Sequence, residues 1–91
     1  MKGEEIIRLC RELVLGMMRD MPECQTGGAG ASNKAIEEVA GLALNLPEQD
    51  GWLTWSIINS LIELGEVERV VIPHGKVVRH NYRLAAPKSA R

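Results

Sequence analysis

The sequence LTWSIINSLIELGEVERVVIPHGKVVRHNYRL, residues 53–84, decides the fold that we expect for the whole chain. Its first half repeats apolar residues every three or four positions, which predicts a helix over residues 53–64. Gly65 follows, and glycine is the usual residue at the left-handed position that ends a helix. Two runs rich in Val and Ile come next, on either side of Pro73-His74-Gly75-Lys76, and they predict a hairpin over residues 66–84. The buried side of the helix is expected to include Ile57, Leu61 and Leu64.

Two further helices are predicted before this stretch. The first runs from Glu4 to about Asp20, and Pro22 stops it. The second begins after Ser32, a residue that often caps helices, and runs to about Leu44. A glycine-rich loop separates the two helices. The apolar face of the first helix contains Ile6, Cys10, Leu13, Val14 and Met17, and that of the second contains Ile36, Val39, Ala40 and Leu44.

The pattern L-x-x-L-G-x-V-x-R over residues 61–69 resembles the second half of a winged helix-turn-helix domain. Residues 32–42 are similar to the first helix of that motif, with Ala40 packing closely on the next helix and Gly41 beginning the turn. The resemblance covers residues 32–84 and implies a mainly α fold with a C-terminal β-hairpin, that is, three helices plus a wing. One domain is expected over residues 1–86, followed by a disordered tail at residues 87–91.

The connection between the second and third helices departs from the usual motif. A standard turn has three or four residues, whereas residues 42–51 intervene here and include Pro47. Either the second helix runs on to Leu46, or the loop between the helices is long.

Charge is distributed unevenly along the chain. Twelve acids nearly balance eleven bases, so the net charge predicts no partner. From Arg69 onward, however, six bases occur and no acid, a pattern typical of a nucleic-acid-binding segment. Charged side chains on an edge hairpin also prevent aggregation, so a simple solvated hairpin remains open.

Several classes of protein are disfavoured by the residues present. Cys10 and Cys24 match no metal-binding spacing, and no Ser, Cys, His or carboxylate pattern suggests catalysis, so we expect no enzyme, metal or cofactor. No stretch reaches the roughly 20 apolar residues of a membrane span. We expect a cytoplasmic protein with reduced thiols and no membrane partner.

The resemblance implies a small DNA-binding protein, a transcriptional regulator whose helix 53–64 enters the major groove while wing 66–84 contacts the backbone. On the second strand Arg79 and Arg83 share one face, whereas Val78, Tyr82 and Leu84 share the other, which we expect to be buried. An Asn side chain can form two hydrogen bonds with adenine, and Lys or Arg can contact the phosphate backbone. The candidate contacts to double-stranded DNA are Ser32, Asn33, Lys34, Thr54, Trp55, Ser56, Asn59, Lys76, Arg79 and Arg83.

A second interpretation stays open, because the predicted third helix contains no Lys or Arg and begins near Trp52 and Trp55. An exposed Trp is typical of protein interfaces, so the alternative is a winged-helix interaction module that binds a protein partner through this helix without binding DNA. We also expect a homodimer, since paired half-sites increase selectivity. The first helix, with Met17, Met18 and Met21 near its end, is the expected seam.

Overall fold

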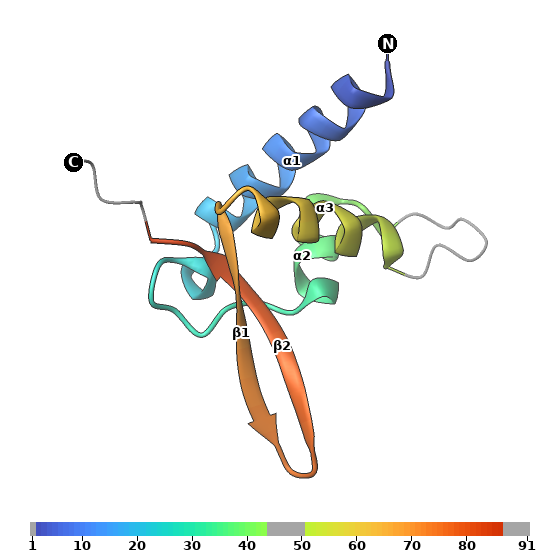
Figure 1. The fold of residues 1–91 in the computed structure, drawn as a ribbon. Helices are drawn as coiled ribbons and strands as arrows, with labels where there is room; N and C mark the ends of the chain where they lie inside the picture. Colours follow the sequence, from blue (N-terminus) through green and yellow to red (C-terminus); the bar gives the residue numbers. More distant parts are fainter. Residues whose placement is uncertain (1, 44–50, 87–91) are drawn as a thin grey trace.

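Three helices are followed by one antiparallel hairpin in the computed structural model, which describes residues 2–43 and 51–86 (Figure 1). This arrangement confirms the coarse prediction of a mainly α chain with a C-terminal β-hairpin. The predicted Leu44, the extension to Leu46, Pro47 and the tail at residues 87–91 lie outside the described residues. The elements are α1 (Gly3–Arg19), the short 3₁₀ helix η1 (Pro22–Cys24), α2 (Asn33–Ala40), α3 (Trp52–Glu63), β1 (Val67–His74) and β2 (Val77–Leu84).

Helix α2 begins after Ser32 as predicted but ends at Ala40, before the predicted end near Leu44. The Ser32 Oγ accepts a hydrogen bond of 3.1 Å from the backbone N–H of Ala35, as an N-cap should. Gly41 has a φ of 71°, and the N–H of Leu42 reaches back to the carbonyl of Glu37 at 2.9 Å. Because these bonds satisfy the last carbonyls, the helix stops at Ala40 instead of continuing toward Leu44.

Helix α3 ends in the same way. Gly65 has a φ of 77°, and the N–H groups of Gly65 and Glu66 donate to the carbonyls of Ile62 and Leu61 at 3.0 Å each. This pair of bonds is the Schellman arrangement, and it directs the chain into β1. Leu64 is exposed as a result, so its predicted burial is wrong, whereas Ile57 and Leu61 are buried as predicted.

The two strands are longer, and the loop between them is shorter, than the predicted turn over Pro73–Lys76 implied. The strands pair from Val67 opposite Leu84 to His74 opposite Val77, so only Gly75 and Lys76 form the loop. Ala31 adds an isolated bridge to Tyr82 on the free edge of β2, with backbone bonds of 2.8 and 2.9 Å. This bridge fixes the chain between η1 and α2 against the base of the hairpin.

The core lies where the second half of α1, η1, α2, α3 and the hairpin base meet. Its members are Val14, Met18, Met21, Cys24, Ala31, Ile36, Ala40, Leu42, Ile57, Ile58, Leu61, Val67 and Tyr82. The predicted stripe of α1 is partly wrong: Val14 is buried and Cys10 and Met17 pack against the core, but Ile6 and Leu13 are exposed. Val39 and Val78, also expected inside, are exposed.

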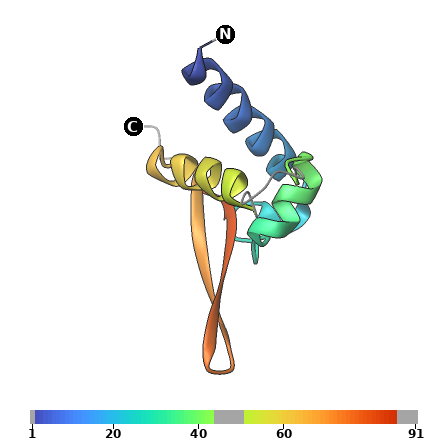
Figure 2. The ribbon, with the colours of Figure 1, turned by 90° about the vertical axis from the view of Figure 1, so that its right-hand side faces the viewer.

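The two ends of the molecule extend in opposite directions from this core. In Figures 1 and 2 the N-terminal half of α1 projects to one side, and the loop of the hairpin lies farthest away on the other. Within residues 2–43 and 51–86, no helix is both long and apolar enough to cross a membrane.

Candidate nucleic-acid interface

The outward face of α3 carries the two tryptophans and a short row of polar residues. Helical periodicity turns Thr54, Ile57, Ile58 and Leu61 toward the core and leaves the other side exposed. Trp52 and Trp55 are 66% and 47% exposed, and their ring centroids lie 6.4 Å apart. Thr54 has no exposed surface, so its predicted contact with DNA is wrong in this conformation. The outward face therefore consists of Trp52, Trp55, Ser56, Asn59 and Glu63.

Asn59 connects this face to the hairpin. Its Nδ2 donates to the carbonyl of Trp55 at 2.8 Å, and its Oδ1 accepts a hydrogen bond of 3.3 Å from the Arg69 guanidinium. Arg69 lies on β1, so the hairpin supplies α3 with the positive charge that its own sequence lacks. Sequence reasoning missed this residue, although the pairing of Arg69 opposite Tyr82 puts it on the strand face that turns inward at the hairpin base.

The same face of the hairpin continues beyond Arg69 into solvent. Val71 pairs with His80, and Pro73 pairs with Val78, so these side chains share the face of Arg69 by the two-residue alternation of strands. All four are exposed. A single surface thus runs from the tryptophans of α3, across Asn59 and Arg69, to the distal part of the hairpin.

Two of the predicted phosphate contacts are free for a ligand. Lys76 lies in the hairpin loop and Arg79 lies on β2 opposite Ile72; both are exposed. Neither side chain forms an ion pair or hydrogen bond with the part of the chain that the structure describes. No acid follows Glu68 in the sequence, so the distal parts of both strands carry none.

Arg83 has a different environment from Arg79, although both lie on the same face of β2. Its guanidinium forms an ion pair of 2.5 Å with Glu68 on β1 and donates to the carbonyl of Gly28 at 2.8 Å. Asn81 donates to the nearby carbonyl of Gly30 at 3.1 Å. Arg83 therefore holds the loop before α2 against the hairpin. Because its guanidinium is already occupied by these contacts, its main role is structural and not phosphate binding.

The three residues at the start of α2 that were predicted to contact DNA also differ from one another in their roles. Ser32 caps the helix, Lys34 is exposed, and the Asn33 Nδ2 donates to the carbonyl of Gly51 at 3.2 Å. Asn33 thereby ties α2 to the residue that precedes α3. The structure does not bring these three residues into contact with Lys76 or Arg79.

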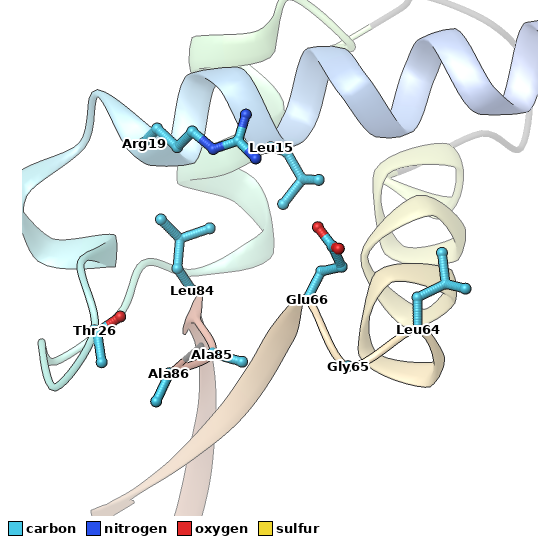
Figure 3. Close-up of a pocket in the computed structure, with 9 residues that line it drawn as sticks. All are labelled: Leu15, Arg19, Thr26, Leu64, Gly65, Glu66, Leu84, Ala85 and Ala86. Carbon is cyan, nitrogen blue, oxygen red and sulfur yellow. The ribbon is translucent and has the colours of Figure 1, made fainter. Parts of the chain in front are cut away.

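A cavity of about 480 Å³ lies at the opposite end of α3, below the second half of α1 (Figure 3). It is open to solvent on one side, its apolar lining comes from α1, from β2 and from the residues that follow α3 and β2, and its charged lining residues are Arg19 and Glu66. It is lined by Leu15, Arg19, Thr26, Leu64, Gly65, Glu66, Leu84, Ala85 and Ala86.

The two cysteines are free thiols, and neither lies on the surface formed by α3 and the hairpin. Burial raises the pKa of the Cys24 thiol to about 11, and the nearby charge of Glu23 acts in the same direction. Since the thiolate is the reactive form, Cys24 is inert near neutral pH. Among the described residues, no group of three or more His, Cys, Asp and Glu side chains could hold a metal ion.

No protein-family model matches the chain, and comparisons with curated proteins and with solved structures find no match either. Function is therefore inferred from the geometry of the surface itself.

Proposed function

We propose that this chain is a winged helix-turn-helix protein that binds double-stranded DNA and acts as a cytoplasmic transcriptional regulator. The observation that carries the proposal is the hydrogen bond between Arg69 and Asn59, which joins the outward face of α3 to a hairpin whose loop carries Lys76 and whose other face carries Arg79. DNA recognition needs both parts, because base contacts give specificity and phosphate contacts give affinity.

In this proposal α3 lies in the major groove with Ser56 and Asn59 toward the base edges. The Asn59 amide keeps one N–H outside its bond to the Trp55 carbonyl, and it exchanges the Arg69 bond for a base contact when DNA binds. Arg69 is then free to contact a phosphate beside the groove. The hairpin is the wing, and its Lys76 and Arg79 contact the backbone farther along the duplex.

A fluorescence anisotropy titration against a labelled duplex tests this proposal. The wild-type chain should bind mixed-sequence DNA and should lose affinity steeply between about 50 mM and about 200 mM salt, since bound phosphates release counterions. Asn59→Ala should cost about 1–3 kcal/mol on a preferred sequence, obtained by selection from a random pool, and little on other sequences. Absence of salt-dependent binding by the wild-type chain would remove the DNA proposal.

The exposed tryptophans support a second candidate, a protein-interaction module. Trp52 and Trp55 form an aromatic pair on α3 that the domain leaves largely uncovered, and such side chains are frequent energetic centres of protein interfaces. The two candidates are distinguished by measuring how Trp55→Ala changes the affinity for DNA and the affinity for a protein partner. A module of this kind would show no DNA affinity, and its binding to a purified partner would be lost in the Trp55 variant.

A further inference from the structure

The N-terminal half of α1 exposes an aliphatic stripe that the domain does not use. Ile6, Leu9 and Leu13 follow one another at intervals of three and four residues, so they lie on one side of the helix. They are 47%, 44% and 38% exposed, whereas Val14 and Met18, on another side, are fully buried. The apolar arc of α1 is therefore wider than the part that contacts the core.

This half of α1 also projects away from the rest of the molecule, as Figures 1 and 2 show from two directions. Such an arrangement leaves the stripe open to another helix. Two of the three methionines that the sequence suggested as the seam, Met18 and Met21, are buried in the core, and Met17 is partly buried against it. The exposed leucine and isoleucine stripe is therefore the larger apolar surface on this side of α1.

We propose that a second copy of this chain covers the stripe, with the two α1 helices packed antiparallel about a two-fold axis near Arg11. In this register Leu9 of each copy lies opposite Leu13 of the other. Ile6 lies opposite Gly16, so a large side chain meets a position without one. The proposal is independent of what α3 and the hairpin bind.

Gly16 supports this register because no neighbour among residues 2–43 and 51–86 requires a glycine there. A Cβ built on Gly16 meets no atom within 4 Å, so the core does not require a glycine there. Glycine in a helix interior is less stable than alanine by roughly 0.5–1 kcal/mol. Gly16 follows Leu13 by three residues and Leu9 by seven, so it lies on the exposed side of the helix, where a partner helix would approach.

The charges at the two ends of α1 match the same register. Lys2 precedes the helix and Asp20 follows it, both are exposed, and neither forms an ion pair within residues 2–43 and 51–86. A cation before a helix and an anion after it both oppose the helix dipole. In the antiparallel pair Lys2 of each copy lies beside Asp20 of the other, which compensates both charges. A parallel pair would place like charges together.

The expected dimer is weak and concentration-dependent. A helix of 17 residues spans about 25 Å, and one helix pair of that length lies at the lower end of specific interfaces in buried area. We expect a dissociation constant on the order of micromolar. The hairpin tips lie far from α1 and stay free in the dimer.

Sedimentation equilibrium of the full chain over a wide concentration range tests the proposal. The wild-type mass should rise from 10.0 kDa toward twice that value. Leu9→Glu should weaken the dimer at least about tenfold because it places a charge in the apolar contact, while circular dichroism should show an unchanged fold. The matched control is Val39→Glu, which changes a similarly exposed aliphatic residue on α2 and should leave the dimer unchanged.

Charge reversal tests the register and the identity of the partner. Lys2→Glu and Asp20→Lys should each weaken the dimer roughly two- to tenfold at low salt, and the double variant should restore it. A wild-type chain that stays at its monomer mass at several hundred micromolar overturns the proposal. A dimer that Leu9→Glu leaves intact, or one in which the double variant gives no rescue, also overturns it.

Discussion

The base of the hairpin and its distal half differ in environment although one continuous ladder joins them. At the base, Val67 and Tyr82 are part of the hydrophobic core, and Ala31 and Arg83 attach the strands to the rest of the chain. Beyond Asn81 the strands extend into solvent, with Val71, Val77 and Val78 exposed (Figure 1).

This difference separates the part of the hairpin that folds the protein from the part that is available to a ligand. A two-stranded hairpin without a covered face is marginally stable in water, so the distal half depends on the base for its order. Its free energy of local opening should be correspondingly lower. The cations Lys76 and Arg79 lie in this half, where contact with a ligand would not disturb the core.

The largest contrast is expected between Tyr82 and Val78, which share one face of β2. Tyr82→Ala should lower the free energy of unfolding by about 3–5 kcal/mol because it removes a buried aromatic ring. Val78→Ala, four residues away on the distal half, should change it by less than about 0.5 kcal/mol. Urea denaturation measures both values, and similar losses for the two variants would contradict the division of the hairpin.

A second pair, Leu61 in α3 and Leu64 just after it, sharpens the comparison of buried and exposed positions. Leu61→Ala should cost about 2–5 kcal/mol, since the side chain is enclosed by the core. Leu64→Ala should cost less than about 0.5 kcal/mol, because this residue is exposed after the end of the helix. Thermal melts of the two variants distinguish them, and a stable Leu61 variant would mean that α3 is placed wrongly.

Alkaline pH should destabilise the core, to which the base of the hairpin belongs, through Cys24. The pKa of this thiol is about 11 in the folded chain against an ordinary 9.0, so the unfolded chain releases its proton first as pH rises. Stability should therefore fall between pH 9 and about 11, by on the order of 2 kcal/mol. The control is Cys24→Ala, whose stability should depend less on pH over the same range in urea denaturation.

Arg83 and Arg79 should show the smallest difference in stability. Arg83→Ala removes the ion pair with Glu68 and the bond to the Gly28 carbonyl, and it should cost about 1 kcal/mol. Arg79→Ala removes no hydrogen bond or ion pair with a described residue and should leave the melting temperature unchanged. Equal effects of both substitutions would show that the two arginines are not divided between structure and surface.

Local signals in the sequence predicted the order and type of the three α-helices and the two strands, but not η1, which lies in the segment predicted as a loop. Ser32 capped its helix as expected, and Gly41 and Gly65 ended theirs, because these residues act through backbone geometry next to them. Burial was predicted less well. Leu64, Val39 and Val78 are apolar and fit the expected periodicity, but each extends beyond the region where other elements meet to cover it.

The candidate surface was predicted only in part for the same reason. Lys76 and Arg79 could be found from the hairpin pattern and its lack of acids. The contact between Arg69 and Asn59, and the ion pair that occupies Arg83, join residues ten and fifteen positions apart. Such contacts depend on how β1 leaves α3 and on strand register, which the sequence pattern did not specify.

The central proposal is that the distal hairpin binds phosphate through Lys76 and Arg79, and the salt dependence of duplex binding tests it most directly. The slope of log affinity against log salt should flatten by about two units in the Lys76→Ala/Arg79→Ala variant, since each lost phosphate contact removes about 0.9. Adding Arg83→Ala should change the slope little further. If the double variant keeps the wild-type slope, or if the wild-type chain has none, the account of the hairpin as a DNA-binding wing is contradicted.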